Sequence, residues 1–548
     1  MISNRPIIIY DTTLRDGAQR EGLALSLSDK LHIAHQLDVL GVPFIEGGWP
    51  GANPKDVQFF WRLQETPLQQ AQLVAFCSTR RPHRRAAEDS MLQAILAAGT
   101  HWVTIFGKSW DLHVTEGLKT ELAENLAMIQ DTVSYLISQG RQVIYDAEHW
   151  FDGYKENPDY ALQTLKAAWD AGAKWLVLCD TNGGTLPHEV SQTIAAIYAA
   201  YPELRTDPEA PQLGIHTHND GELAVANAIA AVQAGVTMVQ GTINGYGERC
   251  GNANLCSVIP NLQLKLGYDC LGSEQLQQLS RTSRMISELA NLAPDDHAPF
   301  VGRSAFAHKG GIHVSAVARN PKTYEHLDPS AIGNERRIVI SDQSGLSNVL
   351  AKARTFGIEL DPKDGACRQI LQQLKELESA GYQFEAAEAS FELLMRSALG
   401  QRPTQFTLKG FQVTCDIWQA IAQACGSNAL ATIKVNVNGE DLLEVAEGNG
   451  PVSALDAALR KALVRFYPEI GDFHLTDYKV RILDSGSGTQ ARTRVLVESS
   501  NGEDHWTTVG VSTNIIDASY QAVVEGIEYG LLRDRQLFGS EQPLNALY

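Results

Sequence analysis

Short apolar runs that alternate with amphipathic segments constrain the fold of this chain most strongly. The runs are continuous, as is typical of strands buried on both faces of a parallel sheet. The segments between them, such as 28–40 and 158–171, have helical spacing. Eight runs are found, at residues 7–10, 42–45, 73–76, 102–106, 143–145, 175–178, 213–215 and 238–241. Eight strand–helix units in about 250 residues predict an α/β fold, a TIM (β/α)8 barrel.

An open, doubly wound sheet is the alternative for such an alternating pattern. That fold carries a G-x-G-x-x-G loop after its first strand when it binds a dinucleotide. No such loop follows residues 7–10, and the eight units are regular. The pattern therefore favours the closed barrel.

Beyond the barrel, the pattern predicts two further regions. A chain of 548 residues is too long for one compact domain. We expect the barrel over 1–270, helical linker subdomains over 271–402, and a C-terminal α+β regulatory domain over 403–548. Segments 451–457 and 511–518 resemble each other, and each opens a helical pattern after alternating strands. This weak repeat predicts two similar β-rich units in the last region.

Composition excludes some classes of partner. The net charge of −19 argues against nucleic acid or an anionic membrane as the main partner. No run of about 18 apolar residues is present, so we expect no membrane span. The N-terminus has no apolar signal segment, and the eight cysteines form no C-x-x-C pair. A reduced, cytoplasmic protein is expected.

A candidate metal site follows the seventh run. His216 and His218 are two residues apart, so their side chains leave a strand on the same face and can share one metal ion. Two ordinary polar residues at a strand end are an equally good reading of this pair alone. Asp16, after the first run, can add a carboxylate oxygen, and Asn252, after the eighth, an amide oxygen. Such mixed ligands suit Mg, Mn or Zn.

Two charged residues at strand ends are candidates for catalysis. Arg15 can bind a carboxylate or stabilise charge on an oxygen. The alternative is a structural ion pair with Glu46 or Asp16. Glu148, after the fifth run, can act as a general acid or base, or it can support its neighbours.

Three motifs resemble one enzyme family. Segments 11–17, 216–220 and 245–252 are similar to signatures of the family of 2-isopropylmalate, homocitrate and citramalate synthases. The resemblance covers the whole chain and implies a metal-dependent barrel that condenses acetyl-CoA with a 2-oxo acid. It implies metal ligation by Asp16, His216, His218 and Asn252, catalysis by Arg15, Glu148 and His313, and substrate contact by Arg15, Gln19 and Thr181. In this family the linker histidine, matched here by His313, usually reaches the active site of the partner subunit. The resemblance therefore implies a homodimer.

Segments 45–56 and 179–184 look most like the citramalate branch of this family. That branch implies pyruvate as the 2-oxo acid, (R)-citramalate as the product, and a role in isoleucine biosynthesis. The resemblance of the C-terminal region implies an amino-acid effector, isoleucine. The alternative within the family is a 2-isopropylmalate synthase, which takes 2-oxoisovalerate.

Two remoter functions share parts of this pattern. Hydroxymethylglutaryl-CoA lyases resemble the barrel and its histidine pair, but they carry a catalytic cysteine in a Gly-Gly-Cys-Pro loop. The corresponding segment here, 245–249, reads Gly-Tyr-Gly-Glu-Arg. A non-catalytic amino-acid sensor is disfavoured because Arg15, Asp16 and Glu148 are intact beside the histidine pair.

Overall fold

The computed structural model describes residues 6–363, 365–416, 428–502 and 504–537. The chain divides into two compact units. The first comprises the residues up to Phe306 together with His326–Arg336, and the second comprises Ala307–Glu325 and the residues from Arg337 onward. Each unit is described separately below. The predicted limits at residues 270 and 402 stay predictions.

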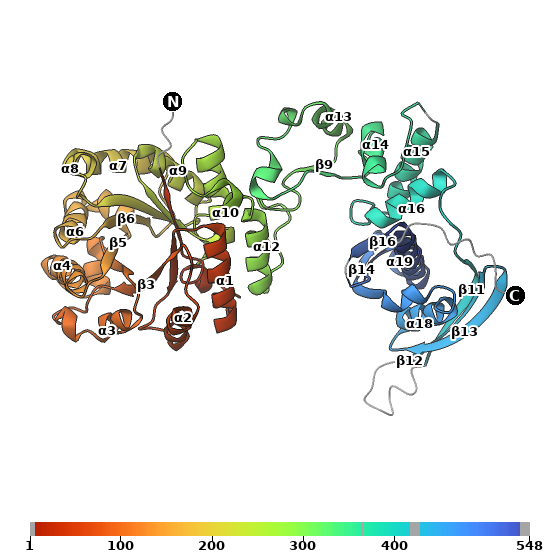
Figure 1. Ribbon diagram of the computed structural model, residues 1–548, viewed down its shortest axis with the longest axis horizontal. Coiled ribbons are helices and arrows are strands. Elements are labelled where there is room, and N and C mark those ends of the chain that lie inside the picture. The colour runs from red at the N-terminus through yellow and green to blue at the C-terminus, as the bar shows by residue number, and fades with distance from the viewer. Residues whose placement is uncertain (1–5, 364, 417–427, 503, 538–548) are drawn as a thin grey trace. The chain divides into compact units, whose positions relative to one another are not determined.

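The first unit is a closed barrel of eight strands in sequence order (Figure 1). All neighbouring strands are parallel, and the first pairs with the eighth. The strands are β1 Ile8–Asp11, β2 Phe44–Gly48, β3 Gln72–Ser78, β4 Trp102–Lys108, β5 Gln142–Glu148, β6 Trp175–Asp180, β7 Gln212–Thr217 and β8 Met238–Gly241. The predicted TIM barrel is confirmed, and each of the eight apolar runs overlaps one strand.

Helices cover the outside of the barrel (Figure 1). They include α1 Leu27–Leu40, α2 Pro54–Glu65, α3 Ser90–Ala97, α4 Leu122–Ser138, α5 Trp150–Glu156, α6 Pro158–Asp170, α7 Pro187–Ala200, α9 Ala224–Ala234, α10 Leu255–Pro260 and α12 Leu279–Leu289. Helix α1 shows why they begin and end where they do. Ser26 and Asp29 form a reciprocal capping box, and Gly41 ends the helix with a left-handed φ of 82°.

The barrel interior changes from apolar to polar along the strands. Side chains two residues apart share a face, so Asp146 lies one layer above Ile144, and Gln240 lies one layer above Met238. Both lower residues belong to a buried apolar cluster inside the barrel. The upper layer faces the carboxyl ends of the strands, where barrel enzymes carry their active sites.

The second unit begins with short helices. A two-residue parallel pair, β9 Ala307–His308 and β10 Arg337–Ile338, precedes most of them. The main helices are α13 Gly311–Arg319, α14 Leu346–Thr355, α15 Gly365–Ser379 and α16 Glu388–Ala398. Buried Val349, Ile370 and Phe391 bring the last three helices into one apolar core.

The predicted internal repeat appears in the second unit as two three-stranded antiparallel sheets, each followed by a helix (Figure 1). The first repeat is β11 Thr407–Asp416, β12 Asn428–Val437, β13 Glu440–Gly448 and α18 Pro451–Leu463. The second is β14 His474–Ile482, β15 Thr493–Ser500, β16 His505–Ser512 and α19 Ile515–Leu537. Each helix packs on its own sheet.

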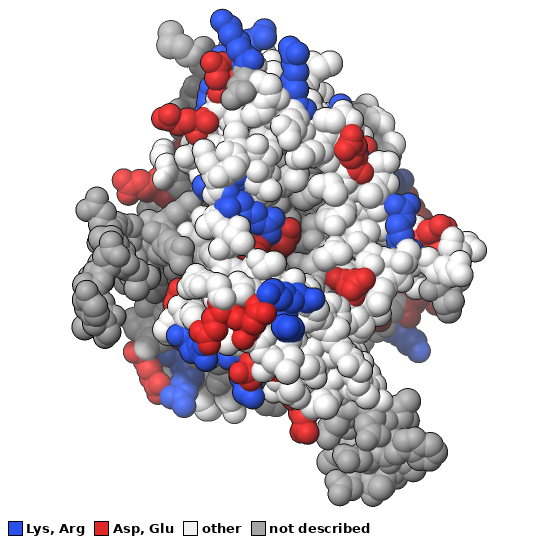
Figure 2. Space-filling view, turned by 90° about the vertical axis from the view of Figure 1, so that its right-hand side faces the viewer, with Lys and Arg blue, Asp and Glu red and all other residues white. Residues whose placement is uncertain are grey.

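The surface carries charge of both signs. On the face that Figure 2 shows, basic and acidic side chains are interspersed. Within the described part of the chain, no helix is both long enough and apolar enough to cross a bilayer. The seven cysteines in that part are free thiols.

Candidate active site

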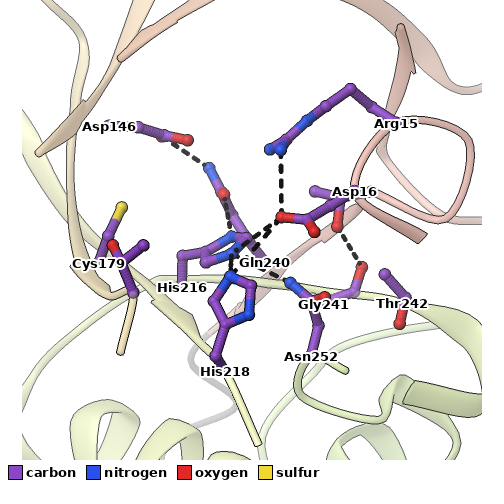
Figure 3. A network of polar contacts seen from close by, with 12 residues as sticks. Arg15, Asp16, Asp146, Cys179, His216, His218, Gln240, Gly241, Thr242 and Asn252 are labelled. Carbon is purple, nitrogen blue, oxygen red and sulfur yellow. Dashed lines mark hydrogen bonds and ion pairs between the residues drawn. The ribbon is translucent and has the colours of Figure 1, made fainter. Parts of the chain in front are cut away.

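The centre of the site is a cluster of three possible metal ligands (Figure 3). Asp16 Oδ2 lies 3.4 Å from His216 Nε2 and 3.8 Å from His218 Nε2. The two imidazole nitrogens are 3.3 Å apart. All three side chains are buried. The loop after β1 therefore meets the end of β7, as the sequence predicts.

The charges of these groups favour a cation between them. Burial and the neighbouring His216 lower the pKa of His218 to about 4, so its imidazole is neutral near pH 7. Burial alone would raise the pKa of Asp16, but Arg15 and His216 hold it well below its usual range. Burial would likewise lower the pKa of His216, yet Asp16 raises it above its ordinary value. An anionic oxygen thus faces two imidazole nitrogens.

Asn252, the fourth predicted metal ligand, lies beside these three side chains. Its Nδ2 lies 3.1 Å from His216 Nε2, and its Oδ1 is buried. Among the described residues, neither this oxygen nor Asp16 Oδ1 has a hydrogen-bond partner. A Cβ on Gly247 would lie 1.7 Å from Asn252 Oδ1, so glycine is required there. The carboxylate of Asp16 and the two imidazoles lie together, and such a donor set fits a divalent metal ion.

Arg15 is held beside this cluster. Its Nε donates to Glu46 Oε2 at 2.5 Å, and one of its terminal nitrogens donates to Asp16 Oδ2 at 3.1 Å. Its guanidinium lies over the ring of Phe76, 3.8 Å from the centroid. Arg15 thus forms ion pairs with both Glu46 and Asp16, the two partners that the sequence suggested. These ion pairs hold its side chain in the cavity wall.

Glu148 lies at the end of β5, opposite Lys108 of β4 in the strand register. The two side chains form an ion pair, and Glu148 also lines the cavity. Gln19 and Thr181 line the same cavity from the loops after β1 and β6. Thr181 Oγ1 accepts a hydrogen bond from the backbone N–H of His149 at 2.9 Å, which fixes its position.

The cavity has a volume of about 200 Å³. Trp49, Phe76 and Phe106 form an aromatic wall on one side. The rings of Phe76 and Phe106 stack with centroids 5.2 Å apart, and Trp49 meets both edge-on. Polar residues, among them Arg15, Asp16, Glu148, His216 and His218, line the rest of the cavity, and Arg15 lies over the ring of Phe76. The cavity thus combines a cluster of possible metal ligands with aromatic side chains.

His313 lies outside the barrel unit, on α13 of the second unit. It is exposed, and its ring stacks on Tyr324 with centroids 4.1 Å apart. The nearby His308 is buried, with its Nε2 3.0 Å from Glu325 Oε1. His313 therefore has the accessible imidazole of the two. Its predicted catalytic role stays a prediction.

Comparison with known proteins places the chain in a family. A curated (R)-citramalate synthase of Synechocystis sp. is 72% identical over 95% of this chain and 96% of its own length. The family model described as HMGL-like matches residues 6–286. The chain belongs to the HMGL-like family. This confirms the resemblance that its three motifs indicate.

Within the HMGL-like family, identity is higher to two curated (R)-citramalate synthases than to one curated 2-isopropylmalate synthase. A curated (R)-citramalate synthase of Geobacter sulfurreducens is 53% identical over 97% of this chain and 99% of its own length. A curated 2-isopropylmalate synthase of Synechococcus sp. is 30% identical over 95% of this chain and 94% of its own length. Models described as a homocitrate synthase post-HMGL domain and a LeuA allosteric (dimerisation) domain match residues 300–381 and 385–531.

Sequence reasoning missed two parts of this HMGL-like site. Phe76 and Phe106 belong to apolar strand runs and look like ordinary core residues. Gln240 lies inside the barrel, bonded to His216. Its only sequence signal is that it is the one polar side chain in the run 238–241.

Proposed function

We propose that this protein condenses acetyl-CoA with pyruvate and hydrolyses the thioester, giving (R)-citramalate and CoA. The observation that carries the proposal is the 72% identity to a curated (R)-citramalate synthase over 95% of the chain. The proposal is supported by the cluster of possible metal ligands, which shares one cavity with Arg15 and Glu148. The alternative, a 2-isopropylmalate synthase, rests on the 30% identity to one such enzyme.

Asp16, His216, His218 and Asn252 would hold a divalent metal ion, Mg, Mn or Zn. When bound, such an ion supplies a Lewis acid that polarises a ketone. Arg15 lies next to the cluster, where its positive charge stabilises the alkoxide that forms from that ketone. Gln19 and Thr181 line the cavity and would orient the 2-oxo acid.

Glu148 would act as the base. Its carboxylate would take a proton from the acetyl methyl group, and the resulting carbanion forms a carbon–carbon bond to the ketone carbon of pyruvate. The ketone oxygen becomes an alkoxide and is then protonated. Water cleaves the thioester, and CoA leaves as the thiol. Lys108 forms an ion pair with Glu148.

The aromatic wall supports the choice of a small substrate. Trp49, Phe76 and Phe106 restrict the apolar side of the cavity. Pyruvate presents one methyl group there, whereas 2-oxoisovalerate presents a branched side chain. We propose that these rings exclude the branched side chain, and each methylene of difference is worth about 1–3 kcal/mol in such a pocket.

The second unit would regulate a cytoplasmic homodimer. Leu443 and Ile482, on β13 and β14, are 67% and 60% exposed. Exposed large apolar side chains of this kind suit contact with a second copy of the chain. In that dimer His313 would reach the partner's active site, and the LeuA-like domain would bind isoleucine as an inhibitor. The free cysteines suit the reducing cytoplasm.

The proposal is tested by product analysis. The purified, full-length protein is incubated with acetyl-CoA, pyruvate and Mg²⁺ or Mn²⁺, and the product is identified by chiral chromatography and mass spectrometry. We expect one (R)-citramalate for each CoA released, and no product when EDTA removes the metal. CoA release without citramalate would contradict the condensation. Full activity in EDTA would contradict the metal site.

A further inference from the structure

We propose that Gln240 is a positioning residue that sets the tautomer of His216 for metal binding, and that Asp146 fixes the Gln240 amide in the orientation this requires. The inference rests on the proposed metal site. It assigns a task to two buried residues, neither of which is placed to bind the metal.

The three residues form a chain of hydrogen bonds inside the barrel (Figure 3). His216 Nδ1 lies 2.8 Å from Gln240 Oε1, and Gln240 Nε2 donates to Asp146 Oδ1 at 3.0 Å. Gln240 is fully buried, and Asp146 is 3% exposed. The chain joins β7 and β8, which are neighbours, to β5 on another side of the barrel.

The direction of these bonds determines the tautomer. An amide nitrogen can only donate, and Asp146 offers an accepting oxygen, so the Gln240 nitrogen turns toward Asp146. The Gln240 oxygen then faces His216 Nδ1 and can only accept. Nδ1 must therefore carry the proton. In a neutral imidazole this leaves Nε2 with a lone pair, and Nε2 is the atom that faces Asp16 and His218.

Asp146 is needed because an amide can turn over. Rotation of the Gln240 amide by half a turn would present its N–H₂ group to His216 Nδ1. That arrangement favours the tautomer with the proton on Nε2, which cannot bind a cation. A carbonyl acceptor at the Asp146 position prevents this rotation.

The two histidines differ in this respect. His218 Nδ1 is buried and has no hydrogen-bond partner among the described residues. Of the two ligands, His216 is thus the one whose tautomer the barrel fixes. Partners that orient a metal-binding histidine typically contribute 10–100-fold to metal affinity, so a loss of this size is expected when Gln240 cannot accept.

The test measures Mn²⁺ binding to the metal-stripped, full-length protein by the electron paramagnetic resonance signal of free Mn²⁺. Gln240→Met keeps the approximate shape and removes both polar atoms. We expect a dissociation constant about 10–100-fold higher than that of the wild type. Gln240→Asn, whose amide is one methylene too short to reach both partners, gives the same test if the methionine variant does not fold. Gln36→Met, a half-buried glutamine on α1, is the matched control and should leave the constant unchanged.

Two variants of Asp146 separate orientation from charge. Asp146→Asn keeps a carbonyl acceptor for Gln240, and we expect affinity within about threefold of the wild type. Asp146→Leu removes the acceptor, and we expect a loss approaching that of Gln240→Met. Equal losses in the two variants would show that Asp146 acts through its charge, which would overturn its orienting role.

Thermal unfolding of the metal-free variants separates positioning from structural support. A merely structural role would lower the melting temperature and leave the Mn²⁺ affinity of the folded protein unchanged, which would overturn the inference. If the wild type binds Mn²⁺ and folded Gln240→Met binds it equally well, only this inference fails. If the wild type does not bind Mn²⁺, the proposed metal site fails with it.

Discussion

Two adjacent residues in the loop after β1, Arg15 and Asp16, place opposite charges at the site. Arg15 points its guanidinium at Glu46 and Asp16, and Asp16 points its carboxylate at the histidine pair. Arg15 therefore keeps Asp16 ionised while Asp16 stays free to ligate. Burial alone would lower the pKa of Arg15, but Glu46 and Asp16 raise it above its ordinary value. Arg15 thus keeps the positive charge that the proposed oxyanion stabilisation requires.

His216→Ala tests the metal site at the residue scale. The variant loses a ligand and leaves Asp16 without its closest imidazole, so CoA release should fall by at least about 100-fold, while near-UV circular dichroism shows a retained fold. The exposed His188→Ala is the control and should keep the wild-type rate. A near-normal rate in a folded His216→Ala protein would remove the metal assignment.

The sequence predicts which residues reach the site better than it predicts how they are oriented. Asp16, His216 and Glu148 follow apolar runs, and the carboxyl ends of parallel strands meet at one face of a barrel. Gln240 and Phe76 lie within the runs. Whether such side chains point inward depends on strand tilt and register, which no local pattern records. The partners of Gln240 therefore had to come from the structure.

At the scale of elements, the loop after β8 presses Asn252 against the cluster. Gly247→Ala would place its Cβ where Asn252 Oδ1 now lies. We expect the Mn²⁺ dissociation constant to rise about 10-fold or more, because the amide must move away. Gly184→Ala is the control, since nothing lies within 4 Å of its added Cβ. Unchanged Mn²⁺ affinity in Gly247→Ala would mean that Asn252 is not a ligand.

Glu525, on helix α19, should make the free energy of unfolding depend on pH. Burial raises the pKa of Glu525 from 4.5 to about 7, although it accepts a hydrogen bond from Ser390. A raised pKa in the folded state means that stability is full below about pH 4.5 and is lost as the pH rises through about 7.

Glu525→Gln should remove this loss. Calorimetry should show a higher melting temperature than the wild type at about pH 8, equivalent to about 1–3 kcal/mol, and little change at about pH 4.5. The exposed Glu447→Gln is the control and should behave as the wild type. An equal effect of Glu525→Gln at both pH values would contradict the assignment.

Strands and repeats were predictable because their signals are local. Continuous apolar runs identified all eight barrel strands, and two similar segments identified the repeated sheet-and-helix units. The short pair β9 and β10 was not predictable, since two residues carry no periodicity. The sequence also did not predict that residues 307–325 belong to the second unit while residues 326–336 belong to the first, because this division depends on tertiary contacts.

At the scale of the whole molecule, catalysis and regulation should be separable. All residues that line the cavity belong to the barrel unit. A chain that ends at residue 402 should therefore keep measurable CoA release and lose inhibition by isoleucine. The full chain, assayed with and without isoleucine, is the control. A truncated protein that still responds to isoleucine would show that the effector binds elsewhere.

The most direct measurement of the central claim is substrate preference. CoA-thiol release is followed with acetyl-CoA, Mg²⁺ or Mn²⁺, and pyruvate, 2-oxobutyrate, 2-oxoisovalerate or 2-oxoglutarate, and kcat/KM is compared. We predict a kcat/KM for pyruvate at least about 10-fold above that for 2-oxoisovalerate, as expected if the aromatic rings exclude a branched side chain. A preference for 2-oxoisovalerate, or no release with any of the four acids, would contradict citramalate synthesis.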